Sequence, residues 1–278
     1  MGSDSIPQFL LKHFENIAIK EGFLNYTLEH EAGSKHGDGF VASMISVKIC
    51  GERAVDGEIQ ADKLNLICKL LPPANIGFEF RLPFEQEVFI YNQILPLLTK
   101  FQTKLGLSES DGFFAFPKCY LATTDPDSND MVIIMKDLRA DSYSMWCKTK
   151  PIGADNVNLV MTQLGRLHGI SFAIRDQEPE LLKQCQSIKD IYLSVHKLKA
   201  IKIFFSNSFE KAIKTCPGEK YFIKLQELGD KWLEWISDCC EANVAEPFSV
   251  VCHGDCWNNN MMFTDVSVSL KVLTLIGF

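Results

Sequence analysis

The sequence has no excess of positive charge and no long uncharged apolar run. Its 278 residues include 28 basic and 35 acidic side chains, which gives a formal net charge of −7. A general nucleic-acid binder normally carries a basic footprint, so this charge balance argues against that class of protein. No apolar stretch approaches the ~20 residues that cross a bilayer, and we therefore expect no membrane span.

The N-terminus lacks a basic segment followed by an apolar stretch, so no signal peptide is visible. The ten cysteines of a chain without an export signal are expected to be reduced thiols rather than a disulfide framework. Both observations favour a cytoplasmic protein. With 46% hydrophobic and 23% charged residues the chain should fold, and its length allows one large domain or two lobes.

Two other kinds of site lack the residues they need. Cys252, His253 and Cys256 are zinc-ligand types, but a structural zinc site takes about four ligands, usually from two paired clusters. No second cluster, such as a C-x-x-C pair, is present elsewhere, and Cys239 and Cys240 have the wrong spacing for one. No G-x-S-x-G turn indicates a serine hydrolase. The sequence therefore disfavours both zinc binding and serine or cysteine hydrolysis.

The most informative segment that is present is V-C-H-G-D-C-W-N-N-N-M-M-F, residues 251–263. It places His253 and Asp255 after a short apolar run, 248–252, for which we predict a strand. Asn260 follows Asp255 by five residues. In phosphoryl transfer to a hydroxyl, a carboxylate orients the substrate proton and a nearby amide oxygen helps to hold Mg²⁺. We therefore expect Asp255 to be the catalytic base and Asn260 a metal ligand.

The pattern H-G-D-x-W-x-x-N resembles the aminoglycoside phosphotransferase and choline kinase branch of kinase-like enzymes. The protein-kinase catalytic loop has the same Asp-to-Asn spacing, with Arg in place of Gly254. Within this branch the whole chain resembles the insect ecdysteroid-kinase-like family. The resemblance implies an α+β, two-lobed protein-kinase-like fold, with an antiparallel sheet in an N-lobe (1–137) and a mainly helical, incomplete C-lobe (138–278). It also implies ATP and Mg²⁺ as cofactors, and a small-molecule alcohol such as an ecdysteroid, or more distantly choline, as the acceptor.

The first half has features of a nucleotide-binding lobe. Three glycines in residues 33–39 precede a strand-like run at 41–49, and a second strand-like run follows at 64–71. A glycine-rich turn lets backbone amides approach phosphates, which makes Gly37 and Gly39 candidate nucleotide contacts. The same residue types also form ordinary hairpins, so this segment alone leaves both interpretations open.

Lys69 lies in the otherwise apolar second run, where a charged side chain needs a partner or a ligand. The resembling family has a strand lysine here that contacts the α and β phosphates and pairs with a glutamate of the next helix. Residues 84–95 carry an apolar helical stripe with Glu87 beside it, whereas Glu85 falls on a more exposed face. The resemblance therefore implies that Lys69 contacts the nucleotide and pairs with Glu87. The alternative places Lys69 on an edge strand facing water.

Residues 115–123 and 131–138 predict a pair of strands around a turn. By resemblance, the second strand leads into the hinge between the lobes, where backbone groups bind the adenine edge. Met135, Asp137 and Leu138 are the candidates for this contact. From the residues alone, the same segment is the end of a hairpin.

Residues 155–175 and 219–241 have the apolar spacing of amphipathic helices. His168 lies on the apolar stripe of the first helix. That position favours a packed helix histidine over a catalytic one, although the resembling family has a Leu-His pair here.

Ile276-Gly277-Phe278 stands where the resembling family has Ile-Asp-Phe, whose aspartate is the main Mg²⁺ ligand. Gly277 offers no carboxylate, and family members continue with helices that shape the acceptor pocket. We therefore expect a C-terminally truncated alcohol kinase with weak or no activity. The alternative is an inactive pseudokinase that acts by binding only. The intact Asp255 and Asn260 favour the first hypothesis, and Gly277 favours the second.

Overall fold

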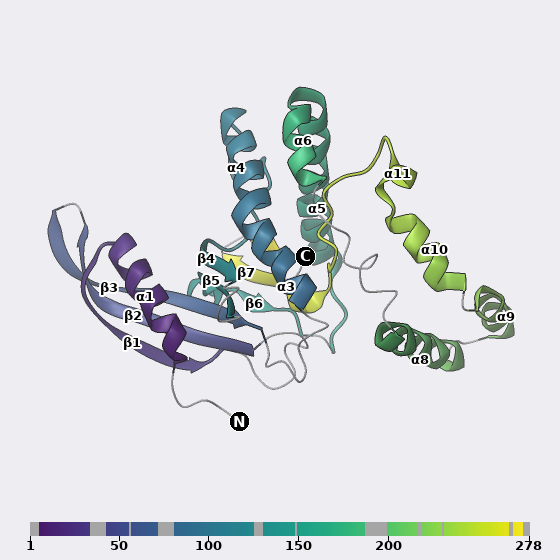
Figure 1. Ribbon diagram of the computed structural model, residues 1–278, viewed down its shortest axis with the longest axis horizontal. Coiled ribbons are helices and arrows are strands. Elements are labelled where there is room, and N and C mark those ends of the chain that lie inside the picture. The colour runs from purple at the N-terminus through teal and green to yellow at the C-terminus, as the bar shows by residue number, and fades with distance from the viewer. Residues whose placement is uncertain are drawn as a thin grey trace. The chain divides into compact units, whose positions relative to one another are not determined.

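The computed structural model describes the chain in segments: residues 6–33, 43–55, 57–71, 81–124, 130–147, 149–186, 199–215, 218–229, 231–266 and 269–274. Packing divides it into two units, one formed by Met1–Leu181 with Cys252–Phe278 and the other by Leu182–Val251. Every predicted site residue that the structure describes belongs to the first unit. The colour bar of Figure 1 locates each segment of the chain by its residue number.

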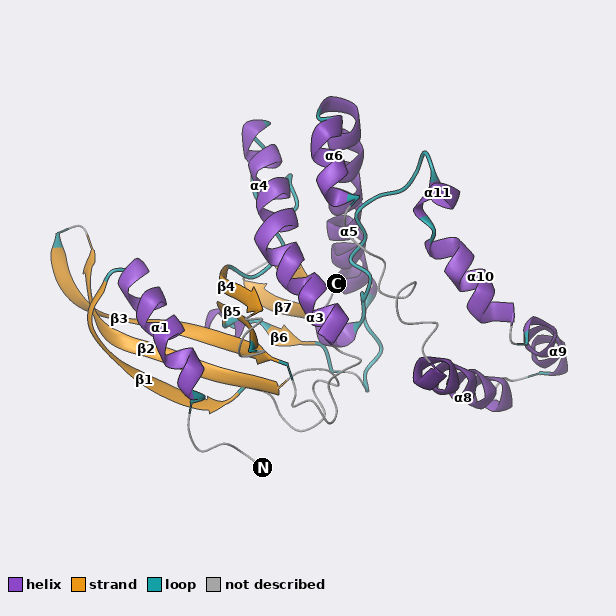
Figure 2. Ribbon diagram, in the orientation of Figure 1, coloured by secondary structure: helices purple, strands orange, loops and turns teal. Residues whose placement is uncertain are grey.

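A five-stranded antiparallel sheet with the order β1-β2-β3-β5-β4 forms the first part of this unit (Figure 2). Both predicted strand pairs are present as antiparallel neighbours. β2 continues past its predicted end at 49 and β3 begins before its predicted start at 64, whereas β4 begins at Cys119 rather than at 115 and β5 ends at Lys136 rather than at 138. β1 was not predicted from the sequence. The strands are β1 Phe23–Ala32, β2 Ser43–Val55, β3 Glu58–Leu70, β4 Cys119–Thr124 and β5 Met131–Lys136.

Helix α1, Gln8–Lys20, packs on one face of this sheet. Its buried side chains recur at the spacing of one helix face. They contact every second residue of β2, β3 and β5, because side chains alternate between the two faces of a strand. The core they form contains Leu10, Phe14, Ile17, Ala18, Phe23, Val47, Ile49, Leu66, Cys68, Val132 and Ile134. Since Cys68 faces α1, its neighbour Lys69 points to the opposite face.

The predicted helix at 84–95 is part of a longer helical segment with a change of geometry in its middle. It comprises α3 Arg81–Phe89, a π-helical turn η2 Ile90–Ile94 and α4 Leu95–Lys104. Pro96 explains the wide turn, because proline has no N–H and its ring collides with the carbonyl four residues earlier in a regular α-helix. In this turn Asn92 donates a 2.8 Å hydrogen bond to the Ala122 carbonyl of β4. The helical segment is thereby fixed to the sheet.

The rest of the first unit is built on a long helix, α5 Ala154–Gln177, and a three-stranded sheet with the order β6-β7-β8. Val160 of α5 packs against Met261 and Phe263 of β7, and the Trp146 ring meets the Phe263 ring edge-on at 6.2 Å. The remaining elements are η3 Leu138–Asp141, β6 Ser144–Met145, η4 Asn258–Asn260, β7 Met261–Val266 and β8 Ser269–Thr274; α6 Pro179–Cys185 crosses the boundary between the units.

The second unit is helical in its described residues, with α8 Lys199–Thr215, α9 Glu219–Leu228, α10 Lys231–Cys240 and α11 Ala242–Ala245. The prediction of one continuous helix over 219–241 is wrong. Gly229 has φ +46° and ends α9, a left-handed conformation that glycine adopts without steric cost. Trp232 of α10 stacks on Phe209 of α8, with ring centroids 5.3 Å apart.

The predicted strand at 248–252 is also wrong, because the backbone of these residues does not adopt strand structure and Phe248 is exposed. Residues 248–252 connect the second unit back to the first. We call the segment 252–260 the Asp255 loop. Among the helices that the structure describes, none is both long and apolar enough to span a bilayer.

Candidate active site

Lys69 and Glu87 form an ion pair between the Nζ and Oε2 atoms, as the sequence predicts. Lys69 lies on β3, the central strand of five, opposite Met44 of β2 and Ile133 of β5. This position rules out the alternative of an edge lysine facing water. Lys69 is 8% exposed and Glu87 2% exposed, so the pair is enclosed by protein. An uncompensated charge is costly in such surroundings, and each side chain therefore needs the other.

The neighbours of this ion pair show how well water is excluded from it. The Phe84 ring lies 6.0 Å from the Lys69 ammonium. Burial raises the pKa of the Tyr91 hydroxyl well above its usual value, and the Glu87 carboxylate adds to the increase. Burial likewise raises the pKa of the Cys119 thiol to about 12. Electrostatic interactions between Lys69 and Glu87 are strong in such an environment.

Glu85, which the sequence places on the exposed side of α3, pairs with Arg81 at 2.8 Å. Both of these side chains are more than one third exposed, in contrast with Glu87. The helix start at Arg81 puts Pro83 in the first turn, where a missing N–H costs no helical hydrogen bond. The choice of Glu87 over Glu85 as the lysine partner is therefore confirmed.

The Asp255 loop brings its two predicted site residues into direct contact. Asn260 donates from Nδ2 to the Asp255 carboxylate at 2.8 Å and to the Asp255 carbonyl at 2.9 Å. Asn260 is buried at the end of the short helix η4, directly before β7, whereas Asp255 is exposed. A fixed amide thus holds an accessible carboxylate in place.

His253 supports the same loop from inside. It is 2% exposed, and its Nδ1 accepts a hydrogen bond from the Asp255 N–H at 3.3 Å. Burial lowers the pKa of the imidazole from 6.5 to about 4, although the Asp255 charge opposes the decrease. His253 is therefore neutral near pH 7, and because Nδ1 accepts a hydrogen bond its proton lies on Nε2. Its role is to hold the backbone of Asp255.

The predicted hinge begins inside the sheet and continues into η3. Met135 is fully buried on β5, between β3 and β4. The Asp137 N–H donates to the Asn65 carbonyl at 2.9 Å, and the Leu138 carbonyl accepts from Tyr143 N–H at 3.2 Å. Internal hydrogen bonds therefore occupy the Asp137 N–H and the Leu138 carbonyl in this structure.

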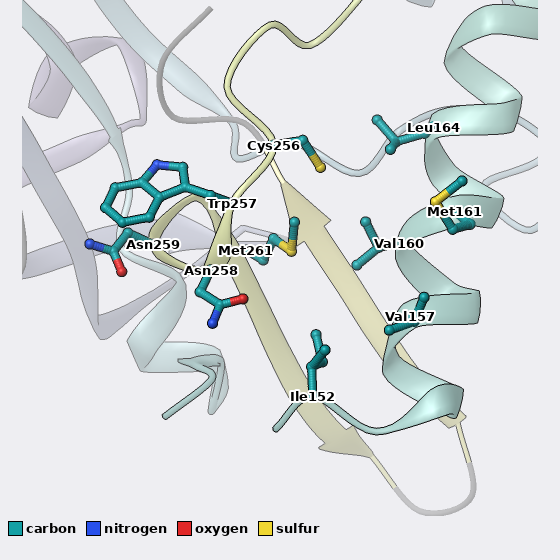
Figure 3. A pocket seen from close by; sticks show the side chains of 10 residues that line it. All are labelled: Ile152, Val157, Val160, Met161, Leu164, Cys256, Trp257, Asn258, Asn259 and Met261. Atoms are coloured by element: carbon teal, nitrogen blue, oxygen red, sulfur yellow. The ribbon is translucent and has the colours of Figure 1, made fainter. Parts of the chain in front are cut away.

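An open cavity of about 540 Å³ lies between α5 and the Asp255 loop (Figure 3). In Figure 3 the Cys256 side chain points toward α5, and the Trp257 indole points away from it. Cavities with apolar walls and few polar groups suit apolar ligand groups. The lining residues are Ile152, Val157, Val160, Met161, Leu164, Cys256, Trp257, Asn258, Asn259 and Met261.

Comparison with known proteins gives one result that bears on this geometry. The model of the ecdysteroid kinase-like family matches residues 36–278, a span that includes Lys69, Glu87, Asp255 and Asn260. The chain belongs to the ecdysteroid kinase-like family. No curated protein and no solved structure matches it.

Membership of the ecdysteroid kinase-like family agrees with the architecture described above. The antiparallel N-terminal sheet and the helical C-terminal part are those of a kinase-like fold. The family is one of kinase-like phosphotransferases, which makes a small molecule the substrate class to consider.

The oxygen atoms near Asp255 fit the Mg²⁺ that this kinase-like family implies. Mg²⁺ prefers oxygen ligands and usually keeps waters and substrate phosphates beside one or two protein carboxylates. Asn260 directs its Nδ2 to Asp255, so Oδ1 is its atom suited to a cation. The described residues contain no group of three or more His, Cys, Asp or Glu side chains that could hold a metal ion. The Asn260 Oδ1 atom is thus the oxygen that would suit a Mg²⁺ ion taking its other ligands from waters and phosphates.

Three predicted residues of the family site lie outside the described part of the chain. These are Gly37 and Gly39 of the glycine-rich segment and Gly277 in the position of the family aspartate. Their roles stay predictions. His168, by contrast, is described on α5 as a partly buried side chain, and burial lowers its pKa.

Two residues near the site were missed by sequence reasoning. His253 belongs to the recognised motif, but nothing in the sequence shows that its ring bonds to the Asp255 N–H. Arg139 binds the Asp137 carboxylate and the Gly33 carbonyl. The sequence shows only an arginine two residues after an aspartate. It does not indicate the contact of Arg139 with the Gly33 carbonyl, which is 106 positions away.

Proposed function

We propose that this chain is an ATP-binding, hydroxyl-directed phosphotransferase-like protein. The observation that carries the proposal is the enclosed Lys69–Glu87 ion pair on the central strand of the sheet. The ammonium of a lysine can bind phosphate oxygens as a point charge. Gly37 and Gly39 would supply backbone amides beside those phosphates.

In this proposal Asp255 accepts or orients the proton of the acceptor hydroxyl. Its exposed carboxylate is open to a substrate, while bonds from Asn260 and to His253 fix its position. Such positioning is a major part of catalysis in phosphoryl transfer. Mg²⁺ held through Asn260 and the phosphates would neutralise the charge of the transferring group.

The segment containing Met135, Asp137 and Leu138 is our candidate for the adenine side of the site. It includes the end of β5, the strand paired with that of Lys69, so we expect a nucleotide with its phosphates at Lys69 to have its base within reach of this segment. The Asp137 N–H and the Leu138 carbonyl already form internal hydrogen bonds, so they are less suitable for binding the base.

For the acceptor we propose a small-molecule alcohol of the ecdysteroid type. Two observations support it: the family of the chain, and the largely apolar cavity next to the Asp255 loop. Choline is a more distant candidate, since an apolar wall of aliphatic side chains offers no negative group to its cation. We place the protein in the cytoplasm, where the free thiols of its described cysteines would persist.

A second candidate function is binding without catalysis, and Gly277 favours it. A glycine in the position of the chief metal-binding aspartate removes one carboxylate that would neutralise Mg·ATP. We therefore expect weak ATP binding to which Mg²⁺ adds little, and turnover that is strongly impaired.

Isothermal titration of ATP tests the proposal. Wild type should bind ATP weakly, and Lys69→Met should lower the affinity at least about tenfold, because a charge-assisted phosphate contact is lost. Lys63→Met is the matched control, since Lys63 lies on the same strand but is exposed. Absence of ATP binding by wild type, or equal binding by Lys69→Met, would contradict the proposal.

A further inference from the structure

Arg139 joins two segments that are far apart in the sequence. Its guanidinium binds the Asp137 carboxylate through Nε at 2.8 Å and Nη2 at 2.6 Å. Its Nη1 donates at 2.9 Å to the carbonyl of Gly33, which directly follows β1. One planar fork thus holds the segment after β5 and the end of β1 together. The guanidinium binds a carboxylate and a carbonyl at the same time, which the single ammonium group of a lysine cannot do with the same geometry.

The Asp137 carboxylate also binds β2. Ser46, which is 3% exposed, donates from Oγ to Asp137 Oδ2 at 3.2 Å. The same carboxylate accepts the Arg139 N–H at 3.0 Å and so caps η3. Burial opposes ionisation, but these hydrogen bonds and the charge of Arg139 lower the pKa of Asp137 below its usual value. The network therefore contains an ionised carboxylate at neutral pH.

Gly33 is held on its other side as well. Its N–H donates to the Met44 carbonyl of β2 at 2.9 Å. A Cβ on Gly33 would lie 2.7 Å from both the Ile67 Cδ1 atom and the Met44 carbonyl carbon, so only glycine fits. Arg139 therefore binds the carbonyl of a glycine whose N–H is already bonded to β2. Gly33 is the first of the three glycines in residues 33–39, and its position sets where that segment leaves β1.

We propose that Arg139 is a positioning residue that fixes Gly33 to the segment after β5 and thereby sets the affinity for the phosphates of the nucleotide. This inference rests on the proposed function, because it assumes that the glycine-rich segment contacts phosphates. Arg139 itself touches no reacting atom. It acts by fixing the Gly33 carbonyl to the segment after β5, so that the glycine-rich segment starts from one fixed position when phosphates bind.

Four proteins test the proposal: wild type, Arg139→Ala, Arg139→Lys and Arg53→Ala. Arg53 is the matched control, because it also binds a carboxylate, Asp62 at 2.6 Å, and a backbone carbonyl, that of Glu21 at 3.2 Å. It pairs with Phe23 at the opposite end of β1. Two readouts are measured: hydrogen exchange of the Gly33 amide without ligand, and the dissociation constants of ATP and adenosine.

Arg139→Ala should speed Gly33 exchange and weaken ATP binding about tenfold each, while adenosine binding changes less than about twofold, because adenosine has no phosphates. Arg139→Lys should resemble Arg139→Ala, since an ammonium cannot span both acceptors. Arg53→Ala should leave Gly33 exchange and both affinities at wild-type values. Restoration of ATP affinity by Arg139→Lys, or equal losses for ATP and adenosine, would overturn the proposal.

If wild type binds no ATP, the proposed function fails. The contact between Arg139 and Gly33 is then tested by hydrogen exchange of the Gly33 amide alone. Faster Gly33 exchange in Arg139→Ala, with no change in Arg53→Ala, would then still show that Arg139 fixes Gly33. Unchanged exchange in Arg139→Ala would overturn the inference whatever the nucleotide affinities are.

Discussion

The ammonium of Lys69 and the carboxylate of Glu87 meet between the central strand and α3, where both side chains are almost fully buried. Removing one partner leaves the other charge buried without compensation. We predict that Glu87→Ala lowers the free energy of unfolding by about 3–5 kcal/mol, as for other broken buried pairs. Urea denaturation measures the change.

Two further variants separate this effect from general damage to α3. Glu85→Ala removes the exposed partner of Arg81 and should cost at most about 1 kcal/mol. The double variant Lys69→Met with Glu87→Leu replaces both charges by apolar groups and should recover most of the lost stability. It should nevertheless bind no ATP. A double variant as unstable as Glu87→Ala would show that the cost does not come from the unpaired charge.

The buried His253 predicts a loss of stability in mild acid. Its folded-state pKa of about 4 lies below the usual 6.5, so the unfolded chain binds the proton more readily. The stabilisation is fully present above pH 6.5 and decreases as the pH falls to 4. The full difference is on the order of 3 kcal/mol. Thermal unfolding between pH 7 and 4 measures it.

His253→Asn is the control for this pH dependence. The asparagine carbonyl can accept the Asp255 N–H as Nδ1 does, but it does not titrate. Carboxylates titrate in both proteins, so the difference between the two profiles isolates His253. Parallel profiles for wild type and His253→Asn would show that this histidine does not cause the acid sensitivity.

Much of the fold and of the arrangement of the candidate site could be predicted because each depends on local patterns. Strand-like apolar runs located β2 and β3, and one helical stripe located Glu87 beside its apolar neighbours. The contact of Asp255 with Asn260 follows from a spacing of five residues within one loop. In these cases the sequence distance between partners is short, or the partner elements are strongly periodic.

The features that were missed depend on tertiary contacts or on single residues. β1 has a mostly exposed burial pattern, so its apolar residues give no clear alternation. The apolar run at 248–252 does not form a strand, and whether an apolar run pairs into a sheet depends on tertiary context that the sequence pattern does not show. Gly229 ends a helix whose apolar stripe continues beyond it. The Arg139 bond to Gly33 joins positions that no local pattern connects.

Gly277 makes a prediction about metal dependence. In wild type, Mg²⁺ should change the ATP dissociation constant by less than about twofold, whereas in Gly277→Asp it should improve binding at least about tenfold through the added carboxylate. Adding Asn260→Ala should remove most of that gain. Asn258→Ala, in the same short helix, is the control and should keep it. A strong Mg²⁺ enhancement in wild type would show that Gly277 does not limit metal binding.

The central claim is that the Asp255 loop is the catalytic part of an ATP-dependent alcohol kinase, impaired in this chain by Gly277. Transfer of radiolabelled phosphate from ATP to an ecdysteroid, with choline as the second acceptor, tests it most directly. We predict no measurable transfer by wild type, transfer to the ecdysteroid by Gly277→Asp, and none by Gly277→Asp with Asp255→Ala, because positioning and charge neutralisation are both required. Transfer that persists without Asp255, or Gly277→Asp protein that binds ATP and phosphorylates neither alcohol, would contradict the claim.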